Sequence, residues 1–240
     1  MLWRMPFLRA LSYCCLLALL AAAPARADDL SDFNAGIEEV LAHHRAALGY
    51  LVEDKPEPTR RELLAMQQAW GKVAAQKRPA VFDVARYTET MLDVSTRIVT
   101  IFLVLDLGNP DVARESLIAI RASLAKLRRE AGVMALSDCV FEADTATADL
   151  ISLADKQSDL GNATLRSDLT AKATDAAAIL RRCDAMTEAA STPEFHALVA
   201  GVLTSLADIA KAIEARDPAR LARLIDELGT FGEELALRYG

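Results

Sequence analysis

Aromatic residues are scarce in this 240-residue chain, where they make up 5% of the sequence. A platform that stacks sugars or bases needs several rings close together. Trp70 is the one tryptophan beyond the first few residues. We therefore expect neither a sugar-binding nor a base-stacking site.

Glycine is also sparse, with ten residues, and the histidines number three. The chain has no glycine-rich phosphate loop, no Gly-x-Ser-x-Gly nucleophile turn and no His-Glu-x-x-His zinc motif. Acidic pairs such as Glu38-Glu39, Asp226-Glu227 and Glu233-Glu234 fall where helix faces should meet solvent. The sequence thus predicts no catalytic residue and no enzyme.

The chain begins with the three zones of a secretory signal peptide. Arg4 and Arg9 precede an apolar stretch over 10–23, and Pro24 leads into Ala25-Arg26-Ala27, a small-x-small cleavage site. The apolar stretch is too short for a stable membrane span. We expect residues 1–27 to be removed during export to the periplasm, leaving no membrane span, with an uncleaved anchor as the alternative.

Removal of the three arginines in residues 1–27 shifts the formal net charge from −7 to −10. An acidic protein gains nothing from the phosphate attraction that drives nucleic-acid binding, and it is repelled by anionic membrane surfaces. The sequence predicts neither partner.

Export also leaves two of the four cysteines, Cys139 and Cys183. In an oxidising compartment an isolated pair most simply forms a disulfide. A metal or redox pair is the alternative, although no second cysteine or histidine lies at ligand spacing beside either residue.

Apolar residues recur every three to four positions, as in amphipathic helices, and no segment shows the alternating pattern of a strand. Pro, Gly and capping residues mark the breaks, including a Thr59–Glu62 capping box at the start of the second helix. The sequence predicts an all-α fold of about eight helices, over 30–52, 59–78, 81–107, 110–132, 137–159, 163–190, 193–216 and 218–237.

Two of these helix starts match at an offset of 108 residues, because Asn109-Pro110 falls on Asp217-Pro218. Other breaks keep nearly the same spacing. We expect an internal repeat, with one antiparallel four-helix unit over 28–133 and a second, disulfide-stapled unit over 134–240.

The stretch from Ile98 to Leu107 is apolar nearly all round. Such a helix is usually buried on every side. The pattern predicts a central helix at the contact between the units, with Phe102 in the core; a docking surface for a partner or an apolar ligand is the alternative.

The ending IAKAIEARDPARLARLIDELGTFGEELALRYG resembles the last hairpin of the soluble periplasmic b-type cytochromes, which are four-helix bundles. The resemblance implies a bundle fold and a periplasmic location. That family ligates haem with a methionine on the first helix and a histidine one turn before the C-terminus. The histidine position falls near Ala236, with Arg128 as its equivalent in the first unit, and neither ligates iron. We expect no cofactor.

The sequence offers one candidate metal site on the first predicted helix. Glu39 and His43 lie four residues apart on one helix face, and His44 projects about 100° further round. A site needs another ligand from a second helix, and the methionines that could offer sulfur to copper are scattered: Met66, Met91, Met134 and Met186.

Taken together, the sequence predicts a periplasmic helical bundle that binds a protein partner or small ligand without transforming it, in an accessory or sensor role. The alternative is a periplasmic metal- or haem-binding carrier that uses His43 or His44 with methionine.

Overall fold

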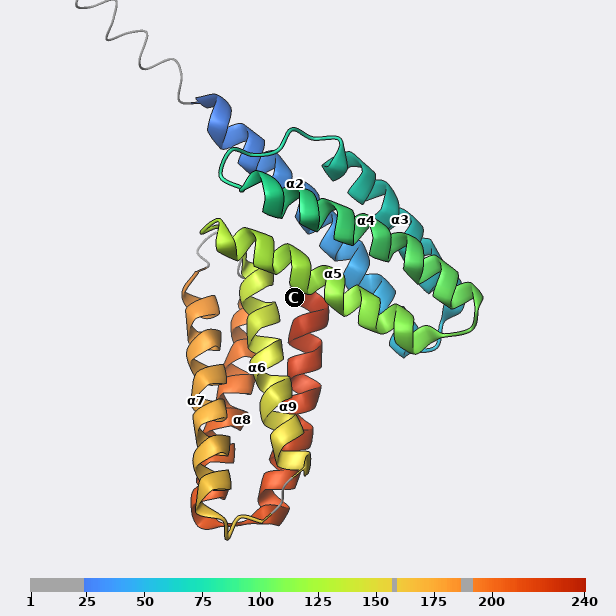
Figure 1. Cartoon of the computed structure of the whole chain (residues 1–240). Helices are drawn as coiled ribbons and strands as arrows, with labels where there is room; N and C mark the ends of the chain where they lie inside the picture. The colour runs from blue at the N-terminus through green and yellow to red at the C-terminus, as the bar shows by residue number, and fades with distance from the viewer. Residues whose placement is uncertain (1–23, 157–158, 187–191) are drawn as a thin grey trace, which may run out of the picture.

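The computed structural model describes residues 24–156, 159–186 and 192–240, which form eight helices and no strand (Figure 1). The all-α prediction is confirmed. The predicted signal peptide lies outside the described residues except for 24–27, which belong to the first turn of the first helix. The helices are α2 (Pro24–Val52), α3 (Pro56–Ala74), α4 (Val84–Asp106), α5 (Pro110–Glu130), α6 (Leu136–Lys156), α7 (Ala163–Ala185), α8 (Pro193–Ala215) and α9 (Pro218–Tyr239).

Three helices begin just after a residue whose side chain caps their first turn. Asn109 accepts a hydrogen bond from the Val112 amide, and Asp217 accepts one from the Arg220 amide. The Thr192 hydroxyl does the same at the start of α8. Each cap precedes a proline, which suits the first helical position because its missing N–H has no intrahelical partner there.

The predicted capping box at Thr59 is wrong. Helix α3 begins one turn earlier, at Pro56, because prolines 56 and 58 fit within a first turn. Thr59 is therefore inside the helix, where its hydroxyl donates to the Lys55 carbonyl at 2.8 Å. Glu62 pairs with His43 of α2 instead of closing a cap.

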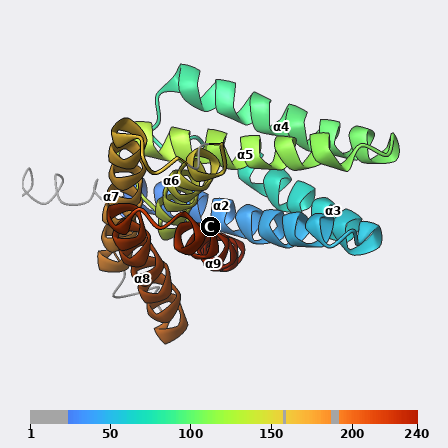
Figure 2. The same ribbon diagram turned by 90° about the horizontal axis from the view of Figure 1, so that it is seen from below.

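Buried hydrophobic side chains form two separate clusters, one drawn from α2–α5 and one from α6–α9. We call these groups of helices the first and second units. The helices of the first unit run across one end of the second, so that the molecule has an L shape (Figures 1 and 2). The inside corner of the L is bounded by α2 and α5 on one side and by α6 and α9 on the other.

The two units pack differently. In the second unit each helix packs closely on two neighbours, which closes a four-helix bundle. In the first unit contact is concentrated within the hairpins α2–α3 and α4–α5, and the hairpins touch each other much less. The 108-residue offset holds at the starts of α5 and α9, at Pro110 and Pro218. Descent of the two units from one duplicated sequence stays a prediction.

The prediction of a central, fully buried third helix is wrong. Helix α4 lies on the outer side of the first unit and packs on α5 and α3, whereas contacts between the units come from α2, α5, α6 and α9. Its inner face buries Val94, Ile98 and Ile101, and Phe102 is half-buried. The outer face exposes four large apolar side chains to between 59% and 68%: Val84, Leu92, Val99 and Leu103. Leu107, the residue just after the helix, is 74% exposed.

Within the described residues, one helix has the length and apolar composition of a membrane span, the 23-residue α8. Its side chains Phe195, Val199, Val202 and Leu206 are buried in the second cluster. The core helix of a bundle can have the same length and apolar composition, so these two features alone do not indicate a membrane span.

A disulfide joins Cys139 of α6 to Cys183 of α7, with the two Cα atoms 5.5 Å apart. The start of α6 and the end of α7 lie side by side because the two helices form an antiparallel hairpin. The bond closes a loop with a sequence separation of 44, as the cysteine count and spacing predict.

Candidate functional site

Buried charged side chains join the two units where α5 leads into α6. Arg121 and Arg128 of α5 are 2% and 1% exposed, and both pair with Asp138 at the start of α6. The Glu38 carboxylate of α2 accepts hydrogen bonds from Arg128 and from the Ser137 hydroxyl, each at 2.8 Å. Two cations and two anions balance, so burial leaves no isolated ion. We call these five side chains the junction network.

An open pocket of about 610 Å³ lies in the corner beside this network. Residues of α2 and α5 form one wall of the pocket, and residues of α6 and α9 form the other. Figures 1 and 2 show how these four helices meet where the two units join. Small-molecule sites typically occupy roughly 300–1,000 Å³. The large apolar side chains of the lining are Leu48, Val52, Ile118, Phe141, Ile151 and Leu237.

Two buried polar side chains of the first unit line this corner pocket with unused hydrogen-bonding capacity. His44 is 3% exposed, and its Nε2–H donates to the Leu117 carbonyl at 2.9 Å. Its Nδ1 is then an acceptor, and it has no hydrogen-bond partner among the described residues. Burial lowers the pKa of His44 to about 4, so the ring is neutral at pH 7.

Arg121 is also buried and also has polar atoms without hydrogen-bond partners. Its Nη1 donates to Asp138 at 3.1 Å, and its guanidinium lies 5.1 Å from the centre of the Phe141 ring. The Nε and Nη2 donors, which share one edge of the guanidinium plane, have no hydrogen-bond partner in the described part of the chain. Burial lowers the pKa of Arg121 to about 10, which leaves the group charged at pH 7.

The wall from the second unit is acidic. Asp144 of α6 is half-buried, and burial together with the nearby Glu233 carboxylate of α9 raises its pKa to about 6. Asp149 lies one turn further along α6 and pairs with Lys172 at 3.0 Å. Two of the three carboxylates of this wall, Asp144 and Glu233, form no ion pair with any described residue.

Helix α9 contributes small residues to the same pocket. Gly229, Gly232 and Ala236 are spaced by three and four positions, so they share one helix face. A Cβ at Gly232 would lie 3.6 Å from the Thr147 methyl, and one at Gly229 would lie 3.8 Å from Ile151. Both distances are ordinary van der Waals contacts, so a methyl group would fit at either position and would fill the space between α9 and α6.

The three residues of the predicted metal site have separate partners. Glu39 is exposed and pairs with Lys72 at 2.8 Å, and His43 pairs with Glu62 at 2.8 Å. His44 is turned inward to α5. No group of three or more His, Cys, Asp or Glu side chains that could hold a metal ion occurs within 24–156, 159–186 and 192–240.

The methionines do not supply a site either. Met66 is buried in the first cluster and Met91 packs at its edge. Met134, between α5 and α6, is 48% exposed, and Met186, just after α7, is 37% exposed. None of the four lines the corner pocket.

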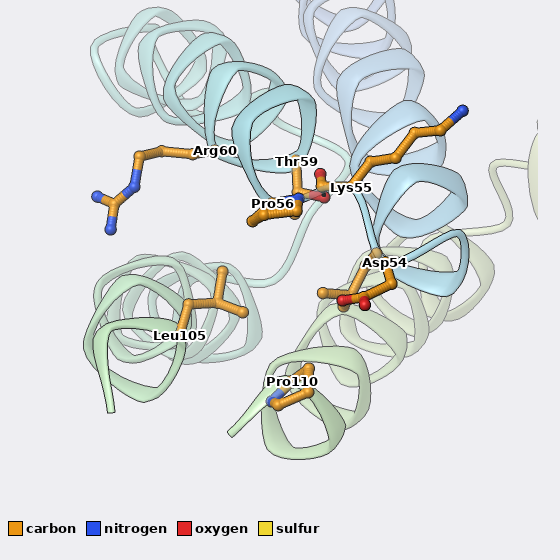
Figure 3. Close-up of a pocket in the computed structure, with 8 residues that line it drawn as sticks. Asp54, Lys55, Pro56, Thr59, Arg60, Leu105 and Pro110 are labelled. Carbon is orange, nitrogen blue, oxygen red and sulfur yellow. Dashed lines mark hydrogen bonds between the residues drawn. The ribbon is translucent and has the colours of Figure 1, made fainter. Parts of the chain in front are cut away.

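A smaller pocket of about 210 Å³ lies at the α2–α3 connection (Figure 3). The close-up shows the Lys55 and Arg60 side chains extending away from the space between Leu105 and Pro110. Lys55 pairs with Glu53, and Arg60 pairs with Asp106. Since its cations are already paired, this pocket is a weaker candidate than the corner pocket.

Sequence reasoning missed Arg121, Arg128 and Asp144 as site residues. One signal was available: both arginines fall on the apolar face of α5, among the buried positions Leu117, Ile120, Leu124 and Leu127. A charged residue on such a face needs a buried partner. The sequence around Asp144 gives no comparable indication, because the Glu233 carboxylate near it lies on a different helix, α9.

No protein-family model, curated protein or solved structure matches this chain.

Proposed function

We propose that this protein is exported to the periplasm by its signal peptide and binds a small ligand in the corner pocket without transforming it. An accessory or sensor component of a periplasmic system suits such a role. The alternative of a metal- or haem-binding carrier has no supporting cluster of side chains in the described residues.

The observation that carries the proposal is the combination of volume with unpaired charged side chains. The pocket offers about 610 Å³, and three charged side chains that line it, Arg114, Asp144 and Glu233, form no ion pair with any described residue. Charges in a partly desolvated site are stabilised by opposite charges brought close to them. A ligand that fills the pocket is the simplest source of those charges.

The non-catalytic part of the proposal rests on the lining. No serine, cysteine, lysine or tyrosine lines the pocket within the described part of the chain. The hydroxyls of the two lining threonines, Thr145 and Thr147, donate to the Phe141 and Ala143 carbonyls of their own helix. The described lining thus offers no thiol, amine or uncommitted hydroxyl nucleophile beside an activating base.

Native mass spectrometry of protein purified from the periplasm tests this function. We expect a chain that begins at Asp28, contains oxidised Cys139 and Cys183, and carries a non-covalent small-molecule adduct. Ala148→Trp should remove the adduct, because Ala148 is exposed and lines the pocket. Ala178→Trp, at an exposed position of α7 outside the pocket, is the matched control and should retain it.

An adduct that survives Ala148→Trp, or a wild-type protein without any adduct, would contradict the proposal. A Soret band or a stoichiometric metal ion in the purified protein would favour the carrier alternative.

A further inference from the structure

The charges that line the corner pocket are sorted by unit. Every charged side chain that α2 and α5 contribute is an arginine: Arg45, Arg114 and Arg121. Every charged side chain that α6 and α9 contribute is a carboxylate: Asp144, Asp149 and Glu233. The pocket therefore has one cationic wall and one anionic wall, with apolar side chains between them.

The two walls do not neutralise each other. None of the ion pairs formed by the described residues joins one of these arginines to one of these carboxylates. Arg45 donates to the Gly240 carbonyl at 2.6 Å, Arg121 pairs with Asp138, and Asp149 pairs with Lys172. That leaves the exposed Arg114 and the Asp144 and Glu233 carboxylates to meet a ligand directly. The Nε and Nη2 atoms of Arg121 are shielded from solvent, so Arg121 acts on a ligand through its positive charge.

We propose that the ligand of the corner pocket is an apolar zwitterion of the amino-acid or short-peptide type, whose carboxylate faces Arg114 and Arg121 and whose ammonium faces Asp144 and Glu233. This inference rests on the proposed function. The apolar body of the ligand lies against Leu48, Ile118 and Ile151, which line the same space.

A ligand with one charge fits less well. A ligand with only a carboxylate is attracted by the arginines but is repelled by the three side-chain carboxylates of the other wall. A ligand with only an amine is attracted by the carboxylates but is repelled by the arginines. Like charges brought together in a partly desolvated site oppose binding, and opposite charges favour it. A zwitterion satisfies both walls at once, and charge-assisted hydrogen bonds are the stronger class.

Isothermal titration calorimetry with leucyl-leucine and two blocked derivatives separates these cases. N-acetyl-leucyl-leucine lacks the ammonium, and leucyl-leucinamide lacks the carboxylate. We expect leucyl-leucine to bind at least about tenfold more tightly than either derivative, since each loses one charge-assisted contact.

Two substitutions assign the charges to the walls. Asp144→Asn should weaken leucyl-leucine about tenfold but should not weaken N-acetyl-leucyl-leucine, because the acetylated compound has no ammonium to lose a partner and meets one like charge fewer. Arg114→Gln should weaken leucyl-leucine but should not weaken leucyl-leucinamide, for the same reason with the charges reversed. Asp175→Asn, at an exposed position of α7 outside the pocket, is the control and should change no affinity.

If the acetylated compound or the amide binds as tightly as leucyl-leucine, the ligand has a single charge and the inference is overturned. Failure of all three compounds to bind overturns it as well. The proposed function is judged separately, by the adduct in the native mass spectrum and its loss in Ala148→Trp.

Discussion

Asp144 and His44 line the same pocket, and burial shifts their pKa values in opposite directions. Asp144 rises from 3.8 to about 6, and His44 falls from 6.5 to about 4. The contribution of Asp144 to folding stability is complete below pH 3.8 and is lost as the pH rises through about 6. That of His44 is complete above pH 6.5 and is lost as the pH falls through about 4. The two effects oppose each other across the same window.

Asp144→Asn should therefore expose the effect of His44. In the variant we expect the free energy of unfolding to rise by about 1–3 kcal/mol from pH 4 to pH 6.5, and in the wild type to rise less, because one pKa unit corresponds to about 1.4 kcal/mol. Urea unfolding at several pH values measures both curves. Asp175→Asn serves as the control for loss of a surface charge.

An Asp144→Asn curve parallel to that of the wild type would show that Asp144 titrates as an ordinary exposed carboxyl group. The anionic wall would then lose its half-buried member.

At the scale of helices, the boundaries were the most predictable feature. Asn109, Thr192 and Asp217 cap the helices that the sequence assigns to them, because a cap and the proline after it act within one turn. Other boundaries were predicted less well. The sequence around Thr59 fits a capping box, but α3 begins earlier because two prolines are tolerated in its first turn, and it ends at Ala74 instead of 78. Helices α2 and α4 begin at Pro24 and Val84 instead of 30 and 81.

The environment of α4 could not be predicted in the same way. Its sequence is apolar nearly all round, but the number of helices that pack on it depends on how the two hairpins of the first unit meet. That contact involves segments far apart in the chain. The result is an exposed apolar face where the sequence predicts a buried one.

Paired substitutions on α4 test this orientation. Ile101 is fully buried, so Ile101→Ala should lower the free energy of unfolding by about 2–4 kcal/mol through the cavity it leaves. Leu103 is 59% exposed, so Leu103→Ala should change it by less than about 0.5 kcal/mol. Urea unfolding of the two variants provides the comparison. Equal losses would place both faces of α4 in the core.

For the whole molecule, the sequence predicts the fold class and the disulfide but not the site. The cysteine pair follows from a count of two and from hairpin geometry. The corner pocket draws on four helices whose contributing residues span His44 to Gly240, and no local pattern reports such an arrangement. Only the two arginines on the apolar face of α5 indicate that something charged is buried nearby.

The junction network explains why the corner has a defined shape. Arg128 is bonded to Glu38 of α2 and Asp138 of α6, so it ties the start of the second unit to the first. Removing one member of a buried charged network leaves its partners uncompensated, which is costly. These bonds thus link the wall formed by α2 and α5 to the start of α6, which belongs to the other wall.

Hydrogen–deuterium exchange with and without saturating leucyl-leucine tests the central claim, that one ligand lies between the two units. We expect slower exchange in both walls together, over 44–52 and 114–121 of the first unit and over 141–151 and 229–237 of the second. Ala148→Trp should abolish the change on both sides. Protection confined to one unit, or found on α4 instead, would contradict the account.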